Sequence, residues 1–157
     1  MKANQGPAAE ICQVEASDLP EIIEIEMESF LTPWSKSSFL KDLTLGFSRF
    51  WAATLTEDGV RRIAGYVLAW DVEDEVHILK LATRRQYQRR GIARFLTERL
   101  LQECRQNGVR RATLEVRETN AAAQDFYRKL DFSRAGIRKG YYSDTGEDAI
   151  LLKKDID

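Results

Sequence analysis

The sequence predicts a mixed α/β domain whose central sheet is mostly antiparallel. Three apolar runs, at residues 49–55, 63–70 and 76–83, are joined by short polar turns, which is the pattern of an antiparallel meander. Segments with helical periodicity lie before and after these runs, as expected where helices pack against a sheet. Hydrophobic residues make up 43% of the 157 residues, which is enough apolar material for one core. We therefore expect a single domain over residues 11–157, preceded by a poorly ordered tail over residues 1–10.

The segments before the meander are predicted to form one short strand and two helices. The strand covers residues 11–15, and a helix follows from Ser17 or Asp18, either of which can cap its first turn. Glu26 falls inside the apolar stripe of this helix, so its carboxylate is expected either to bend towards solvent or to border a cleft. Ser35 is the expected cap of the second, shorter helix. The stripe follows the i, i+3, i+4 spacing of a buried face and consists of Leu19, Ile22, Ile23, Met27 and Phe30.

The segments after the meander alternate between helix and strand. A helix is predicted over residues 90–106, and Asn107-Gly108 ends it because both residues adopt the left-handed conformation at low cost. A buried strand over residues 112–116 is followed by a helix that Asn120 opens and that runs to about residue 130. Two further strands are predicted, at residues 132–137 and 149–152.

The charge balance and the scarcity of metal-binding side chains exclude several function classes. Lys and Arg total 24 against 25 for Asp and Glu, whereas a dedicated nucleic-acid-binding domain is normally clearly basic. Direct nucleic-acid binding is therefore not expected. The two cysteines, Cys12 and Cys104, lie far apart, and with His77 as the single histidine they cannot build a four-ligand zinc site. We expect no metal ion, and we expect His77 to have a structural role.

The sequence also lacks the signals of a membrane or secreted protein. No apolar run reaches the roughly 18 residues of a membrane-spanning helix, and the N-terminus has no apolar signal-peptide segment. Two scattered thiols fit a reducing compartment where no disulfide is needed. We expect a cytoplasmic protein without a membrane partner.

The charges are unevenly distributed along the chain. Between Asp18 and Glu28 there are five acidic residues and no basic one, whereas between Arg84 and Arg94 there are five arginines and no acid. The arginine run contains Gly91 where a helix is predicted to start, directly after a predicted strand. The free backbone amides and the dipole at such a helix start favour anions. These residues alone predict either a solvated charged face or a site for phosphate groups.

The segment Gln88-x-x-Gly91-x-Ala93 after a strand resembles the acetyl-coenzyme A signature, Q/R-x-x-G-x-G/A, of the GNAT N-acetyltransferase superfamily. The likeness continues through Leu114-Glu115-Val116-Arg117, Asn120-Ala121-Ala122-Ala123, Phe126-Tyr127 and Leu130-Asp131-Phe132. Within the superfamily, the chain is most similar to the bacterial enzymes that acetylate the N-terminal alanine of a ribosomal protein. It departs from the pattern at Arg84-Arg85, where an acidic residue and proline often stand, and at Asp131, where glycine is usual. Asp tolerates tight turns, so we expect a small local cost there and no change of fold.

The resemblance implies the GNAT fold, with helices on both faces of the sheet, and acetyl-CoA as the acetyl donor. The expected contacts with acetyl-CoA come from the end of the third meander strand, the turn after it, the start of the next helix and one later helix cap. They are Leu81, Ala82, Thr83, Arg89, Arg90, Gly91, Ile92, Ala93, Arg94 and Asn120.

Acyl transfer from a thioester to an amine requires a base, an oxyanion contact and an acid for the leaving thiolate. The resemblance assigns the base to Glu115 and the acid to Tyr127. A free glutamate, with a pKa near 4.3, is too acidic for efficient direct abstraction, so we expect a raised pKa for Glu115 or a bridging water. The oxyanion contact is expected from a backbone amide along Leu81–Thr83.

The resemblance further implies that the acceptor is the α-amine of a protein N-terminus, specifically the alanine of a small-subunit ribosomal protein. A carboxylate and aromatic side chains would line the groove for this basic peptide, namely Glu26, Trp34, Tyr141 and Tyr142. Transfer would be direct, in a ternary complex. Three alternatives remain: a GNAT enzyme for a small-molecule amine, a catalytically silent acyl-CoA-binding module, and an RNA contact through Arg84–Arg94.

Overall fold

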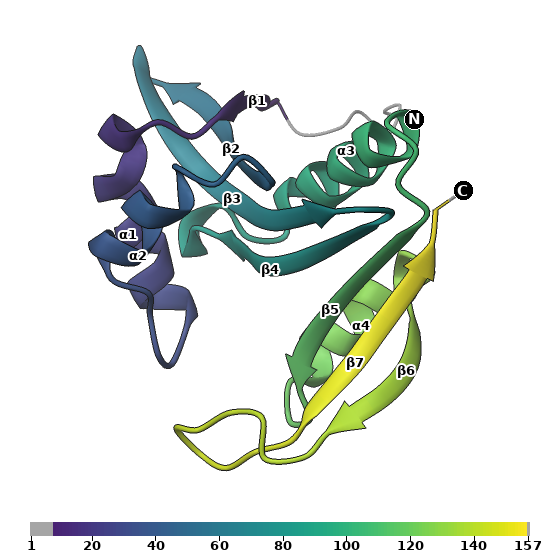
Figure 1. Cartoon of the computed structure of the whole chain (residues 1–157). Helices are drawn as coiled ribbons and strands as arrows, with labels where there is room; N and C mark the ends of the chain where they lie inside the picture. The colour runs from purple at the N-terminus through teal and green to yellow at the C-terminus, as the bar shows by residue number, and fades with distance from the viewer. Residues whose placement is uncertain (1–7, 157) are drawn as a thin grey trace, which may run out of the picture.

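The structure, a computed structural model that describes residues 8–156, is built on a seven-stranded sheet with the order β1-β2-β3-β4-β5-β7-β6 (Figure 1). Neighbouring strands are antiparallel except for β4 and β5, which are parallel. The strands are β1 (Glu10–Gln13), β2 (Ser48–Glu57), β3 (Val60–Val72), β4 (Glu75–Thr83), β5 (Arg111–Arg117), β6 (Ser133–Arg138) and β7 (Ala149–Asp155). The helices are α1 (Leu19–Ser29), α2 (Lys36–Asp42), α3 (Ile92–Gln106) and α4 (Ala121–Lys129), with short 3-10 turns at Ala16–Asp18 and Arg85–Tyr87. The predicted fold class is confirmed.

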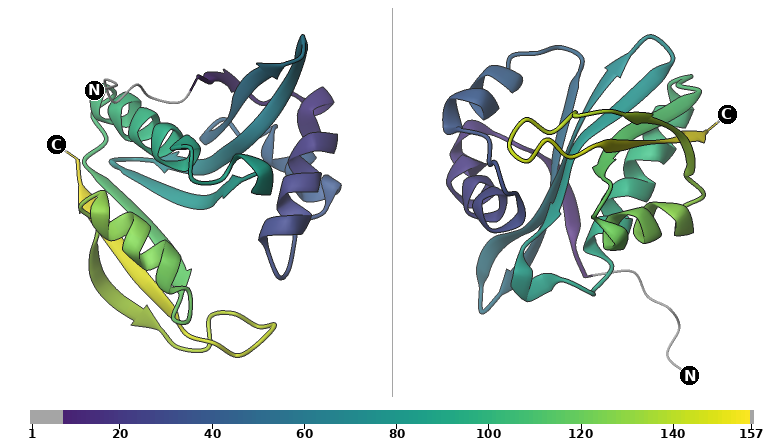
Figure 2. Two further views of the ribbon diagram at one scale, coloured as in Figure 1. Left: turned by 180° about the vertical axis from the view of Figure 1, so that it is seen from behind. Right: turned by 90° about the horizontal axis from the view of Figure 1, so that it is seen from below.

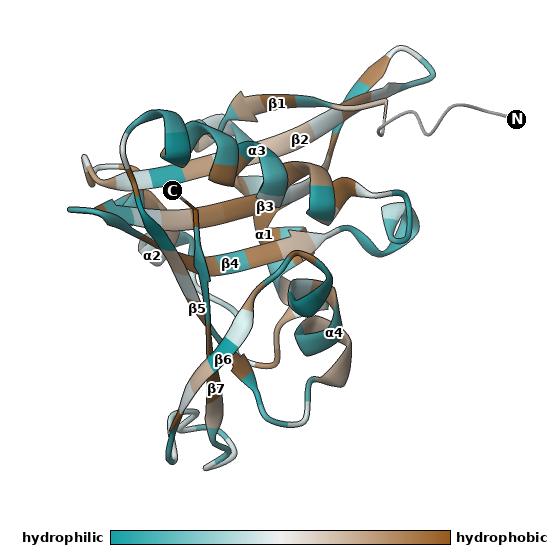
Figure 3. Ribbon diagram, turned by 90° about the vertical axis from the view of Figure 1, so that its right-hand side faces the viewer, coloured by the Kyte–Doolittle hydropathy of each residue, from teal (hydrophilic) through white to brown (hydrophobic). Residues whose placement is uncertain are grey.

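Helices cover both faces of the sheet, with α1 and α2 on one side and α3 and α4 on the other (Figure 2, right). Residues Ile63–Ala69 of β3 form an uninterrupted buried run because the strand is covered on both faces. Figure 3 shows the hydrophobic residues of β3 along the middle of the sheet. A Cβ at Gly65 would lie 2.6 Å from the Ala82 carbonyl oxygen and 3.0 Å from the Ile92 side chain. Glycine at this position therefore lets β3, β4 and the start of α3 approach closely.

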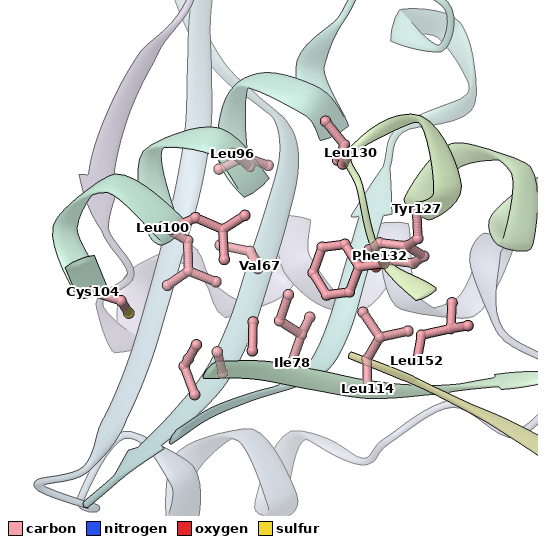
Figure 4. Packing of buried hydrophobic residues seen from close by; sticks show 14 of the residues in the cluster. Val67, Ile78, Leu96, Leu100, Cys104, Leu114, Tyr127, Leu130, Phe132 and Leu152 are labelled. Atoms are coloured by element: carbon pink, nitrogen blue, oxygen red, sulfur yellow. The ribbon is translucent and has the colours of Figure 1, made fainter. Parts of the chain in front are cut away.

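The larger of the two cores lies between the sheet and helices α3 and α4 (Figure 4). Leu96, Leu100 and Cys104 of α3 pack onto the strands, and Tyr127 of α4 stacks edge-on against Phe132 at a centroid distance of 5.3 Å. Burial raises the pKa of the Cys104 thiol to about 11, so the thiol stays protonated and packs as a small core side chain. This core fixes α3 and α4, the helices on which the predicted acetyl-CoA contacts depend.

Helix α1 differs from its predicted form. Its buried residues are Leu19, Ile22, Ile25 and Glu26, whereas Met27, predicted to be buried, is 67% exposed. The buried face is rotated because Ile25, and not Ile23, continues the stripe after Ile22. Asp18 precedes the helix as expected, but its carboxylate accepts a hydrogen bond from the Glu15 amide and does not cap α1. Ser35 caps α2 as predicted, by accepting from the Ser38 amide at 3.1 Å.

The start of the chain is only partly described. Residues 1–7 of the predicted tail lie outside the described residues, and Glu10 is the first residue of β1, opposite Thr54 of β2. No helix within residues 8–156 is long and apolar enough to cross a membrane.

Asp131 occupies the turn from α4 to β6 with a φ of 66°. This left-handed conformation favours glycine and costs a non-glycine residue roughly 1 kcal/mol. The turn nevertheless closes, because the Phe132 amide donates to the Tyr127 carbonyl at 3.0 Å. The fold is unchanged by the aspartate, as predicted from the sequence.

Candidate active site

Strands β4 and β5 run side by side over only three residue pairs. Glu75–His77 of β4 pair with Arg111–Thr113 of β5, and beyond these residues the two strands diverge (Figure 1). The rest of β4 therefore has a hydrogen-bonding partner on its β3 side and none on its β5 side. Where two parallel strands separate in this way, their main-chain groups are free to bind another molecule.

The free groups on β4 can be identified from the pairing with β3. The Arg84 amide donates to the Ala64 carbonyl at 2.7 Å, and hydrogen bonding alternates along an antiparallel pair. The amides of Leu81 and Thr83 consequently face away from β3, into the parting of the strands. In agreement, the Gln88 side chain, which lies outside the sheet, donates to the Thr83 carbonyl at 3.4 Å. Two of the three predicted contacts on β4 thus present backbone groups to the opening.

The start of α3 presents a second set of free amides. Gly91 is the N-cap, with a φ of 78°, and no side chain within the described residues accepts from this end of the helix. The first intrahelical bond runs from the Phe95 amide to the Gly91 carbonyl, so the amides of Ile92, Ala93 and Arg94 have no intrahelical acceptor. The side chains of Arg89, Arg90 and Arg94, close to this helix end in the sequence, are exposed, and the Arg94 guanidinium is paired with Glu98 at 2.8 Å. The arrangement fits a pyrophosphate group.

The arginine turn also contacts helix α1, through the Arg84 side chain and the Arg85 backbone. The Arg84 guanidinium contacts Glu24 at 3.0 Å and Glu21 at 3.3 Å, both on α1. The Arg85 amide donates to Glu28 of the same helix at 2.8 Å. Three acidic side chains of α1, Glu21, Glu24 and Glu28, are therefore engaged with the arginine turn.

Glu115 lies on β5 just past the last residues that pair with β4. Its side chain is 8% exposed, and its carboxylate is held by His77 Nε2 at 2.7 Å and by Arg138 Nε at 3.1 Å. Burial alone would raise the pKa of Glu115, but the hydrogen bonds and charges of His77 and Arg138 outweigh it and lower the pKa below its ordinary value. The expected rise in pKa is wrong. A bridging water then remains the route by which this carboxylate can act as a base.

Tyr127 belongs to α4 and to the core that this helix forms with the sheet. Its ring is enclosed by Phe126 and Phe132, and burial raises the pKa of its phenol. Among the described residues the Tyr127 hydroxyl makes no hydrogen bond, and it is not one of the fully buried atoms without a partner, so it is free to donate to a bound molecule. Asn120 opens the same helix and caps it by accepting from the Ala123 amide at 3.1 Å.

The predicted acceptor-side aromatics come from two loops that meet. Trp34 belongs to the loop between α1 and α2, and Tyr141 and Tyr142 belong to the loop between β6 and β7, which extends from the sheet in Figure 2. The Thr32 hydroxyl of the first loop donates to Asp144 of the second at 2.8 Å. Tyr141 and Tyr142 stack edge-on at 5.0 Å, and Tyr141 remains 49% exposed. Three of the four predicted acceptor residues thus lie on loops that this contact joins.

Glu26 is the exception, because it has no exposed surface. Its carboxylate accepts from the Trp34 amide at 2.7 Å, from Lys80 Nζ at 2.6 Å and from the Tyr66 hydroxyl. The Lys80 ammonium also lies 4.3 Å from the ring centre of Phe30 and 4.8 Å from that of Trp34. Neither expected position of Glu26, in solvent or at a cleft, is correct: the carboxylate holds the Trp34 loop against β4 from inside.

The chain matches the acetyltransferase (GNAT) family model over residues 19–132. The chain belongs to the GNAT acetyltransferase family. It is 36% identical over 144 residues to the [ribosomal protein bS18]-alanine N-acetyltransferase of Escherichia coli (strain K12), covering 90% of this chain and 94% of the relative. It is 32% identical over 145 residues to the protein of the same name in Haemophilus influenzae, with 90% and 95% covered. The crystal structure of the E. coli ribosomal-protein-S18-alanine N-acetyltransferase superposes with a TM-score of 0.84, 34% identity and coverage of 95% and 94%.

In this GNAT acetyltransferase, sequence patterns missed two side chains that the structure brings to the site. Lys80 should share a face with Val76 and Ile78 by strand alternation, yet it faces α1 because a β-bulge falls at Leu79. His77, for which the sequence predicts a structural role, contacts Glu115 at 2.7 Å. A bulge gives no reliable signal in one sequence. His77, in contrast, is evident in the sequence as the single histidine, but the sequence does not show that it contacts Glu115 on β5.

Replacing Glu26 by Gln is expected to destabilise this GNAT acetyltransferase by about 3 to 5 kcal/mol at pH 7, because the Lys80 ammonium would stay buried without its counter-charge. Burial already lowers the pKa of Lys80, against the raising effect of Glu26. Without Glu26, the pKa of Lys80 would be lowered further. The unfolded chain would then bind a proton that the folded chain does not, so the loss of stability would shrink as the pH rises towards 10. Urea unfolding at pH 7 and close to pH 10 measures the free energy of unfolding at each pH.

The matched control is Glu24→Gln, which removes an exposed carboxylate of the same helix. It should cost at most about 1 kcal/mol, as surface ion pairs do. Equal losses for the two variants would contradict the structural role of Glu26.

Proposed function

We propose that this GNAT acetyltransferase transfers acetyl directly from acetyl-CoA to the α-amine of a protein N-terminus. The acceptor that best fits is the N-terminal alanine of a small-subunit ribosomal protein. The observation that carries the proposal is the parting of β4 and β5. It leaves unpaired backbone amides on β4, opposite the strand β5 that carries the Glu115 carboxylate. The names of the relatives at 32% and 36% identity support the choice of acceptor.

The donor side would be formed by β4 and the start of α3. The amides of Ile92, Ala93 and Arg94 would bind the pyrophosphate of acetyl-CoA, aided by the charges of Arg89 and Arg90. The amides of Leu81 and Thr83 would bind the arm that carries the acetyl group, with Ala82 between them and Asn120 contributing from α4. Acetyl-CoA supplies an acetyl group activated as a thioester.

On the acceptor side, an α-amine has a pKa near 8, so part of it is already neutral at physiological pH. The Glu115 carboxylate would remove the remaining proton through a water molecule. A backbone amide of Leu81 or Thr83 would stabilise the negative charge that develops on the thioester carbonyl oxygen. The Tyr127 hydroxyl would first donate a hydrogen bond to the departing thiolate and then transfer its proton, because the enclosed site raises the basicity of that thiolate.

Direct transfer also fits the positions of the two cysteines. Cys104 is buried in the core, and Cys12 lies on β1 at the sheet edge that is farthest in strand order from the parting. Neither thiol is placed to carry the acetyl group, so both substrates must be bound together.

The test is coenzyme A release from acetyl-CoA with eight-residue peptides of one basic sequence that begin with Ala, Ser, Met or acetyl-Ala. The Ala peptide should be preferred by at least about tenfold in kcat/KM over the Met peptide, in the range of discrimination by side-chain size. The acetyl-Ala peptide, which has no free α-amine, should give no turnover. Initial rates with both substrates varied should give intersecting lines.

Three results would overturn the proposal. Faster turnover of a polyamine than of any peptide would indicate a small-molecule acetyltransferase. Acetyl-CoA binding without turnover of any amine would indicate a binding module. RNA binding that weakens steeply with salt and competes with coenzyme A would indicate a nucleic-acid site at Arg84–Arg94.

A further inference from the structure

His77 is the one histidine of the chain, and it lies where β4 and β5 part. It belongs to the last pair of the parallel ladder, opposite Thr113, and its ring reaches along β5 to the next inward residue. Nε2 lies 2.7 Å from Glu115 Oε2, and Nδ1 lies 2.8 Å from the Thr113 hydroxyl. Both ring nitrogens are thus held by β5 side chains, which fixes the orientation of the ring.

The ring also connects the buried carboxylate with solvent. The Glu115 side chain is 8% exposed, whereas that of His77 is 30% exposed. His77 contributes to the wall of a surface hollow whose other charged members are Glu73, Asp74, Glu75 and Arg111. A proton can therefore enter or leave the imidazole from this hollow without passing through the parting of β4 and β5.

We propose that His77 is a positioning residue that switches Glu115 between a competent and an incompetent base. With a neutral imidazole, Nε2–H donates to Glu115 Oε2 and Nδ1 accepts from the Thr113 hydroxyl, so the carboxylate is oriented and its second oxygen faces Arg138 and the opening. With an imidazolium, Nδ1–H donates to the Thr113 oxygen and the carboxylate becomes one half of an ion pair. The ion pair weakens its basicity, and proton abstraction from the amine slows.

The direction of the effect follows from the charges around the pair. Glu115 faces His77 from β4 and Arg138 from β6, and Tyr141 of the β6–β7 loop lies near enough to feel its charge. Two positive partners hold the pKa of Glu115 below its ordinary value even though burial acts in the opposite sense. Arg138 is charged at every relevant pH, whereas histidine is the type of side chain that can gain or lose a charge near neutral pH.

The inference depends on the proposed role of Glu115 but not on the identity of the acceptor. The ratio of kcat at pH 8 to kcat at pH 6 should be smaller in His77→Gln than in the unmodified enzyme, because glutamine can donate a hydrogen bond to Glu115 but cannot become charged. The rates are measured by chromatography of released coenzyme A, with the Ala peptide and acetyl-CoA both saturating.

The matched control is Arg111→Gln, which removes a charge from the same hollow without touching Glu115. Its ratio should equal that of the unmodified enzyme. If His77→Gln lowers kcat equally at both pH values, His77 has only a structural role and the proposal is wrong.

A second measurement needs neither substrate, so it separates this inference from the proposed function. The untagged protein contains one imidazole, whose ring signals can be followed by NMR without assignment. Their titration curve should change on Glu115→Gln, because the two groups share a proton equilibrium. Superimposable curves would overturn the proposal. If the curve changes but the protein acetylates no peptide, the proposed acceptor is wrong, whereas the proposed coupling of His77 and Glu115 stands.

Discussion

Replacing Glu115 by Gln is expected to lower kcat by at least about tenfold, in the range of general-base contributions. Glutamine keeps the shape of the side chain and can still accept from Arg138, but it cannot take a proton. The KM for acetyl-CoA should be unchanged, since the donor contacts lie on β4 and α3. The residual activity should rise with pH through the pKa of the α-amine, near 8, because a neutral amine no longer needs the base. Steady-state kinetics from pH 6 to pH 9 measure both effects.

The control for this substitution is Glu118→Gln, which changes an exposed carboxylate three residues further along the chain. It should leave kcat and both KM values unchanged. A Glu115→Gln enzyme with full activity at pH 7 would contradict the assignment of the base.

Removing the Tyr127 hydroxyl by a Phe substitution should also lower kcat by at least about tenfold. The ring would keep its contacts with Phe126 and Phe132, and the hydroxyl makes no hydrogen bond among the described residues that the substitution would remove. Thermal stability should therefore not fall, which separates a catalytic loss from a folding defect. Coenzyme A release and a thermal melt of the same preparation measure the two quantities.

A matched substitution is Tyr87→Phe, which removes a buried hydroxyl that also lacks a partner among residues 8–156. That variant should be at least as stable as the unmodified protein, because an unsatisfied buried polar group is lost. It should retain its kcat. Equal activity of the Tyr127→Phe and Tyr87→Phe enzymes would exclude Tyr127 as the acid.

The elements predicted most successfully from the sequence are those whose signal is local. The cap at Ser35, the left-handed glycine that ends α3 at Gly108 and the buried run of β3 all depend on a few neighbouring residues. The buried face of α1 was partly mispredicted. Two apolar residues, Ile23 and Ile25, compete for the core, and only packing against the sheet decides between them.

The sequence by itself determined the order of the elements, the mixed sheet and the acetyl-CoA signature around Gly91, because backbone propensity and apolar spacing are written in consecutive residues. Only the tertiary structure decided how charged side chains are used. A bulge at Leu79 turned Lys80 towards Glu26, and the end of the short β4–β5 ladder placed His77 against Glu115. The reason is physical: the pKa and the role of an ionisable group depend on neighbours that are distant in the sequence, which the fold alone brings within hydrogen-bond distance.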